Sequence, residues 1–151
     1  MNKHNNIIIH VIIPLFFGSL IYILFRDQKL LMFDWFQSIG LNNFIYTLRE
    51  NIFNNNLPRW LLYSFPDGIW TYSLTSFMII TWHKEKKKIK YFWLLLGPIL
   101  GISTEIFQFF GMIPGTFDKI DFIFCIIASL IPFYLFRKYV KGEKHEINNN
   151  V

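Results

Sequence analysis

The sequence predicts an all-α fold, namely an integral membrane four-helix bundle with both termini on the cytoplasmic side. The chain of 151 residues is 53% hydrophobic and only 17% charged, well away from the soluble globular average. Basic residues gather at one set of segment ends. The length allows one domain, which we place at 1–142, with a disordered cytoplasmic tail at 143–151. The apolar segments that we expect to cross the membrane are 7–25, 60–82, 91–110 and 120–136.

The first segment, 7–25, is long enough to be a membrane span. It has 19 residues without a formal charge, and at about 1.5 Å per residue it can cross a hydrocarbon core of about 30 Å. A signal peptide is the alternative, because Lys3 precedes the apolar run. The run is long for a signal peptide, however, and no small-residue cleavage site follows Phe25. We therefore expect an uncleaved helix.

The other three segments differ in how clearly they are bounded. Tryptophans bracket the segment 60–82, as expected of rings that lie at the two membrane interfaces. The segment 91–110 follows a strongly basic stretch. The last segment, 120–136, is short, but it is long enough to cross the membrane if Asp121 lies at the level of the lipid headgroups.

The distribution of basic residues predicts the orientation. The loop 83–90 holds five lysines, and the positive-inside rule places such a loop in the cytoplasm. Four spans then put both termini inside. On this topology ten of the 15 Lys and Arg residues are cytoplasmic and five are outside. The basic residues flank apolar segments, so we expect the lipid bilayer as a partner and no nucleic acid.

The first outer loop, 26–59, is too polar to span the membrane, but it begins with a cluster of apolar side chains around Trp35. A helix lying in the outer membrane interface is one way to bury them. A poorly ordered loop is the alternative, because asparagines recur at 42–43 and 54–56.

Polar side chains converge at the outer ends of the predicted spans. An ionisable residue inside a span costs about 2.5 to 3.5 kcal/mol at the centre, so each needs a reason. We predict a small polar pocket open to the outside, suited to a cation, a proton, or the hydroxyl, amine or sugar groups of an envelope ligand, with Trp70, Tyr72 and Phe109 as its aromatic lining. The polar residues that this topology brings to one depth are Asp67, Glu105, Gln108, Asp118 and Asp121. Of these, we take Glu105, Gln108, Asp121 and Asp67 as the ligand-binding set.

Each of these residues also has a structural interpretation. Asp67 follows Pro66 and precedes Gly68 in a turn signal, so it can cap the next helix. Asp118 can be the N-cap of the last span, with Asp121 three residues on. Glu105 lies inside its helix and cannot cap, although it can be a hydrogen-bonded structural residue. It is the strongest functional candidate.

Other features predict packing rather than chemistry. Gly97 and Gly101 form a small-xxx-small pair, which is typical of close helix packing. We expect a hydrogen-bonded or interfacial role for His10, and His83 to face solvent or lipid headgroups. No basic group is placed to activate Ser103 or its neighbour as a nucleophile, and phosphate-loop, HExxH and CxxC motifs are missing. We therefore predict no catalytic residue, metal site or cofactor.

The C-terminal half resembles the VanZ-like family of small bacterial integral membrane proteins. The resemblance rests on the pair Glu105 and Gln108, the loop from Pro114 to Asp118, and Asp121 opening the last span. An aspartate after a proline at the mouth of an earlier helix is matched by Asp67. The resemblance implies a multi-pass protein of the bacterial plasma membrane, with an envelope lipid, glycan or glycopeptide as ligand, in a family named for a role in resistance to the glycopeptide teicoplanin.

The chain departs from the family pattern at four positions. Gly115 stands where the family usually has arginine, and Thr71 stands for a histidine. Cys125 and Ala128 stand for an asparagine and a glycine.

Four functions compete on this evidence. The first is a membrane protein whose outer-leaflet carboxylate pocket binds an envelope component or a small polar ligand. The second is a small secondary transporter with a helix broken at Pro66–Asp67–Gly68, although we expect almost no polar path through the inner half of the bundle. The third is a non-catalytic accessory subunit that packs on a membrane protein partner. An enzyme with Glu105 and an aspartate as an acid/base pair ranks below them.

Overall fold

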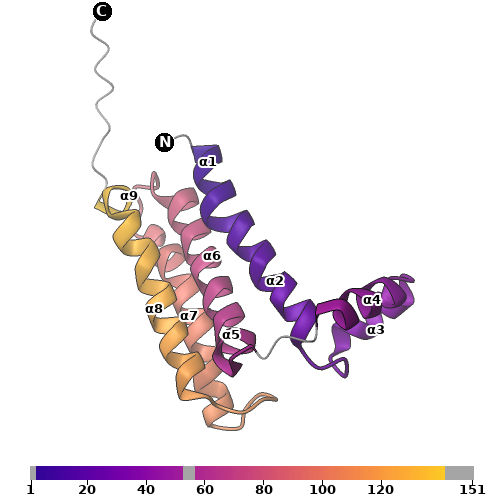
Figure 1. The fold of residues 1–151 in the computed structure, drawn as a ribbon. Helices are drawn as coiled ribbons and strands as arrows, with labels where there is room; N and C mark the ends of the chain where they lie inside the picture. The colour runs from indigo at the N-terminus through magenta and orange to yellow at the C-terminus, as the bar shows by residue number, and fades with distance from the viewer. Residues whose placement is uncertain (1–2, 53–56, 142–151) are drawn as a thin grey trace, which may run out of the picture.

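The structure, a computed structural model, describes residues 3–52 and 57–141 and is helical throughout, without a strand in these ranges. The long helical rods of the chain lie side by side (Figure 1). The first is continuous from Lys3 to Phe25, and the others are α6 (Ser64–Trp82), α7 (Ile89–Phe109) and α8 (Lys119–Leu135). Along the first rod lie α1 (Lys3–Ile7), a π-helical turn η1 (Ile8–Ile12) and α2 (Ile13–Phe25). The all-α prediction is confirmed. The predicted disordered tail, 143–151, lies outside the described residues.

Four short helices complete the described chain. Two of them, α3 (Leu31–Ser38) and α4 (Asn42–Ile52), follow the first rod, and α5 (Arg59–Leu62) leads into α6. The last, α9 (Arg137–Lys141), follows α8. Helix α1, the turn between α6 and α7, and α9 lie at one end of the bundle, and the loop between α7 and α8 lies at the other (Figure 1). We call the first the basic end, defined by Lys3, Lys84, Lys86, Lys87, Lys88, Lys90, Arg137 and Lys138. The opposite end, with Asp67, Glu105 and Asp121, is the carboxylate end.

Helix α6 is the centre of the bundle, in contact with α2, α7 and α8. Its buried face carries small hydroxyl residues, of which Thr71 and Thr75 donate hydrogen bonds to the carbonyls four residues earlier, at 2.9 and 2.7 Å. Gly97 and Gly101 of α7 lie directly against these two threonines. Because neither glycine carries a Cβ, the two helix backbones approach closely. The predicted packing role of the glycine pair is confirmed.

The basic end is held by an apolar cluster of Ile79, Ile80, Leu94 and Phe136. His10 hydrogen-bonds to the Tyr72 hydroxyl at 2.6 Å, as expected of a hydrogen-bonded histidine. His83, which we expect to face solvent or lipid headgroups, also packs within the basic end. Its ring is half-buried, lies 4.6 Å from the Tyr139 ring and hydrogen-bonds to the Ile80 carbonyl.

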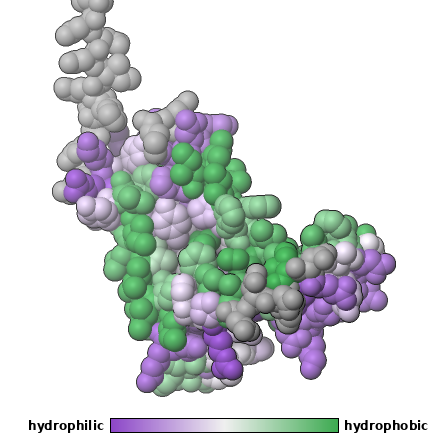
Figure 2. All heavy atoms as spheres, in the orientation of Figure 1, coloured by the Kyte–Doolittle hydropathy of each residue, from purple (hydrophilic) through white to green (hydrophobic). Residues whose placement is uncertain are grey.

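The outer surfaces of the long helices are apolar. On the face in Figure 2, hydrophobic side chains occupy the middle of the bundle and hydrophilic ones lie at its ends. Two helices, Lys3–Phe25 and Ile89–Phe109, are long and apolar enough to cross a membrane. Among the described residues, only these two of the four predicted spans meet the criteria of length and composition. Helix α8 has 17 residues, and α6 contains Asp67 and many hydroxyl side chains. Large apolar side chains exposed on the long helices include Phe16, Phe17, Phe92, Ile99, Ile127, Leu130 and Tyr134.

The segment after the first rod is helical rather than an irregular loop, at least over the described residues 31–38 and 42–52. Helices α3 and α4 project sideways from the carboxylate end of α2 (Figure 1). This arm, α3 and α4 with the short connection between them, exposes the large apolar side chains of Leu31, Trp35, Ile39 and Phe44, which fits a position in the membrane interface.

Arg49 fastens the arm to the first rod. Its guanidinium donates to the carbonyls of Ile23 (2.7 Å) and Arg26 (2.8 Å) at the end of α2, and it lies over the Phe33 ring. The last carbonyls of a helix have no partner within that helix, so a buried cation that binds two of them stabilises the helix end. The side chain is accordingly buried.

We expect Arg49→Gln to lower the free energy of unfolding by about 1 to 2 kcal/mol, because two charge-assisted hydrogen bonds are lost. The arm should also become more sensitive to limited proteolysis. Thermal unfolding in detergent and mass mapping of the fragments measure the two effects. Arg59→Gln, which removes a charge from an exposed side chain, is the control. Equal behaviour of the two variants would contradict this role of Arg49.

Candidate functional site

A cavity of about 480 Å³ opens at the carboxylate end. Its wall comes from α2, α6, α7 and α8 and from the loop that joins α7 to α8. The lining residues are Tyr22, Arg26, Asp67, Trp70, Thr71, Leu74, Gly97, Gly101, Thr104, Glu105, Gln108, Pro114, Gly115 and Cys125. We call this cavity the carboxylate pocket.

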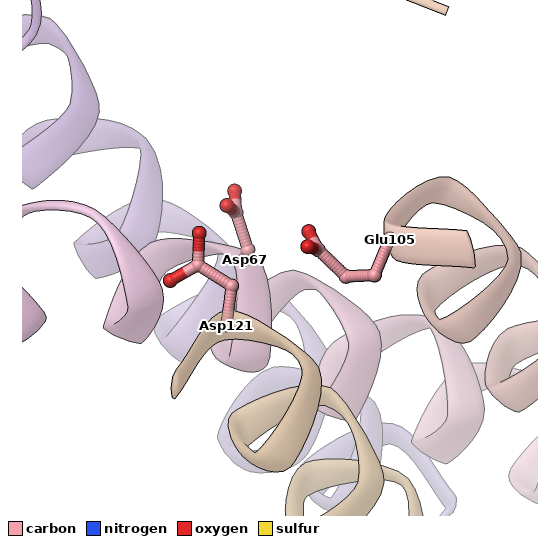
Figure 3. A group of neighbouring side chains, drawn as sticks. All are labelled: Asp67, Glu105 and Asp121. Atoms are coloured by element: carbon pink, nitrogen blue, oxygen red, sulfur yellow. The ribbon is translucent and has the colours of Figure 1, made fainter. Parts of the chain in front are cut away.

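Three carboxylates from three helices meet at the pocket. Asp67 comes from the first turn of α6, Glu105 from the last part of α7 and Asp121 from the first turn of α8. One carboxylate oxygen of each lies within 4.8 Å of the other two. Figure 3 shows the three side chains pointing toward one another. The convergence therefore depends on how the helices are packed and not on a local motif.

Burial makes this arrangement costly unless something compensates it. The Glu105 side chain is only 3% exposed, and its Oε2 has no hydrogen-bond partner among the described residues. The Oδ1 atom of Asp121 is also buried and has no hydrogen-bond partner within residues 3–52 and 57–141. Buried charged oxygens without partners carry the full cost of desolvation.

One cation compensates part of the charge. The Nη2 atom of Arg26 lies 3.5 Å from Oδ2 of Asp67, the one ion pair in the described chain. The same guanidinium lies over the rings of Tyr22 and Tyr63, at 4.9 and 4.8 Å from their centroids. With all three carboxylates ionised, the site would keep two negative charges in excess, so it requires protons or a bound cation.

The structure brings the predicted ligand-binding residues together. Asp67, Glu105 and Gln108 line the pocket, and Asp121 completes the carboxylate group. The Gln108 amide lies against the backbone of Gly115, where a Cβ would come within 2.7 Å of Nε2. Gly115 also has a φ of 130°, which other residues rarely adopt. A glycine is therefore needed at this point of the α7–α8 loop.

The predicted aromatic lining is correct only for Trp70. Tyr72 points to the other side of α6, where it binds His10 and lines a separate apolar hollow. Phe109 is exposed and packs edge-to-face on Phe117. The helical periodicity of α6 and α7 explains both results, because these two positions fall on faces turned away from the pocket.

The capping predictions have different outcomes. Asp118 is the N-cap of α8, and its Oδ1 accepts a hydrogen bond from the Ile120 N–H at 2.8 Å. Asp67 caps nothing, because α6 already begins at Ser64 and has no side-chain cap. The predicted turn and helix break at Pro66–Asp67–Gly68 are wrong, since the helix runs through them. Pro66 fits in the first turn because no N–H donor is needed there.

Sequence reasoning missed Arg26 and the floor of the pocket. Arg26 directly follows the first span, and its position at a helix end was the only signal for a partner role. Lys119 and Arg59, also on that side, form no ion pair in the described chain. At the floor, the Thr71 hydroxyl lies 3.7 Å from the Cys125 sulfur.

The inner half of the bundle is more polar than predicted. Ser73, Thr75 and Ser76 of α6 are buried, and Oγ of both serines lacks a partner among the described residues. Gly97, however, packs directly on Thr75. The hydroxyl groups therefore belong to a closed helix interface and do not extend the pocket as a channel.

Comparison with protein-family models, with curated proteins and with solved structures finds no match to this chain.

Proposed function

We propose that this chain is a multi-pass protein of the bacterial plasma membrane, and that its carboxylate pocket faces outward and binds a polar ligand of the cell envelope. The convergence of Asp67, Glu105 and Asp121 on one cavity is the observation that carries the proposal. Functional residues are often kept at a cost to the fold, and an unpartnered buried carboxylate fits that description.

The membrane assignment rests on the surface of the bundle. Contiguous exposed apolar side chains on this scale are rare in soluble monomers. Two helices are long enough and apolar enough to span by themselves. We propose that α6 and α8 span with them, because α6 is shielded by its neighbours and α8 can begin at headgroup level with Lys119 and Asp121. The positive-inside rule then places the basic end in the cytoplasm and the pocket outside.

The VanZ-like resemblance supports the same site. Thr71 and Cys125 stand at two positions where the family pattern is broken, and they contact each other at the pocket floor. These two residues differ from the family pattern and lie in contact with each other. This is consistent with a single site that has kept the carboxylates of the family while the residues at its floor have changed. We therefore propose a divergent VanZ-like protein, with an envelope lipid, glycan or glycopeptide as ligand.

The orientation can be tested with a cysteine at the pocket rim. Thr104 is exposed and lines the pocket, and Lys87 lies in the turn at the basic end. In a Cys125→Ser background, Thr104→Cys should react with a membrane-impermeant maleimide on intact cells. Lys87→Cys should react only after permeabilisation. The reverse pattern would overturn the outward-facing pocket.

Ligand binding can be tested on protein released from native membranes. Native mass spectrometry should show a bound species on the wild type that is lost in Glu105→Gln and kept in Asp34→Asn. The control removes one acidic group from an exposed position in α3. A species retained equally by both variants, or no bound species at all, would count against the pocket. In that case the accessory-subunit function would be favoured.

A further inference from the structure

The three carboxylates lie close enough to share one cation. The oxygens of Asp67, Glu105 and Asp121 lie within 4.8 Å of one another. Ca²⁺ binds oxygen at about 2.3 to 2.6 Å and accepts flexible geometry, so it suits ligands that come from three separate helices. Mg²⁺ demands near-ideal octahedral geometry at about 2.0 to 2.1 Å and usually keeps several waters, so a buried group of protein carboxylates suits it less.

An unsatisfied group points to the same position. The Glu105 side chain is buried, and its Oε2 has no hydrogen-bond partner in the described chain. Figure 3 shows this carboxylate facing Asp67 and Asp121. Water is largely excluded from this side chain, so a cation held between the three groups would supply the missing interaction.

The chemistry of the lining favours a hard cation. Besides the carboxylates, Thr104 and Gln108 offer oxygen atoms to the pocket, and its residues include no histidine. The single sulfur, that of Cys125, lies 3.7 Å from the Thr71 hydroxyl. Carboxylate, amide and hydroxyl oxygens select calcium-like ions, while zinc prefers nitrogen and sulfur. Three ionised carboxylates, Arg26 and one divalent ion also sum to zero charge.

We propose that Asp67, Glu105 and Asp121 bind one Ca²⁺ ion at the mouth of the pocket. This inference rests on the proposed pocket and specifies its chemistry. Ca²⁺ takes six to eight oxygen ligands, and the three carboxylates supply three of them when each gives one oxygen. The remaining positions are open to water or to hydroxyl and phosphate oxygens of an envelope ligand, so the ion forms part of the ligand-binding surface.

The test uses the purified full-length protein and Ca²⁺ alone as the probe. Isothermal titration in detergent should give one saturable site, and Tb³⁺ in its place should show luminescence sensitised by Trp70, which lines the pocket. Glu105→Gln should weaken Ca²⁺ binding at least tenfold, and Asp121→Asn should do the same if the first variant fails to fold. The matched control Asp34→Asn should bind as the wild type does. Mg²⁺ should bind at least tenfold more weakly than Ca²⁺.

The calcium proposal is overturned if the wild type shows no saturable Ca²⁺ binding, or if Asp34→Asn weakens binding as much as Glu105→Gln. Equal affinity for Mg²⁺ would overturn the choice of ion. These outcomes are distinct from failure of the pocket itself. A co-purifying ligand that depends on Glu105 while Ca²⁺ does not bind would leave the pocket in place and remove only the cation.

Discussion

In the absence of divalent cations, Glu105→Gln should raise the free energy of unfolding by about 1 to 3 kcal/mol. Two like charges less than 5 Å apart repel by about 3 kcal/mol at an effective dielectric constant of 20. Glu105 faces Asp67 and Asp121, while Arg26 forms its ion pair with Asp67. An amide keeps the shape of the side chain and removes the repulsion. Thermal unfolding in detergent with a chelator measures the change.

Asp121→Asn is the matched comparison. It should raise the free energy of unfolding by less than Glu105→Gln does, because Asp121 is less buried than Glu105. With Ca²⁺ added, the wild type should be more stable than Glu105→Gln, because a ligand at 100 times its Kd stabilises the folded state that binds it by about 2.7 kcal/mol. A loss of about 1 to 3 kcal/mol in Glu105→Gln without Ca²⁺ would show instead that the carboxylate is a satisfied structural partner. The pocket would then be a packing feature.

The largest destabilisation should come from Gly97→Ala, with a loss of about 3 kcal/mol or more. An added Cβ would collide with the Thr75 hydroxyl and would lie 2.8 Å from the Thr75 backbone N and Cα. A side chain can rotate away, but backbone atoms can move only if α6 and α7 separate. Overpacking of a well-packed core usually costs about 1 to 3 kcal/mol, and a backbone collision lies at the upper end.

Gly68→Ala provides the control for Gly97→Ala, since its Cβ would meet Phe124 at an ordinary 3.4 Å. It should be neutral or stabilising by up to about 1 kcal/mol, because alanine is the better helix former. Circular dichroism melts in the same detergent compare the two. Equal midpoints for both variants would contradict the close contact of α6 with α7.

Hydropathy was sufficient to predict the long helices, because an uncharged apolar run as long as 7–25 can form few structures other than a helix. The cap at Asp118 was also predictable, since it depends on neighbours two residues away. Placing Glu105, Asp67 and Asp121 together needed only the antiparallel order of the helices.

The remaining features depend on tertiary packing, which hydropathy does not encode. Pro66 and Gly68 are typical turn residues, yet contacts of α6 with three neighbours keep this segment helical. The side of α6 on which Tyr72 lies follows from the rotation of the helix in the bundle. The pairing of Arg26 with Asp67 joins residues 41 positions apart, and no local pattern marks it.

The position of Cys125 has a practical consequence. It is the only cysteine of the chain, and it lies at the floor of the pocket with its side chain almost fully covered. The native protein therefore carries its own single-site reporter. A ligand in the pocket should slow the reaction of this thiol with a small neutral reagent, so the reaction rate would report occupancy of the pocket without any engineered label.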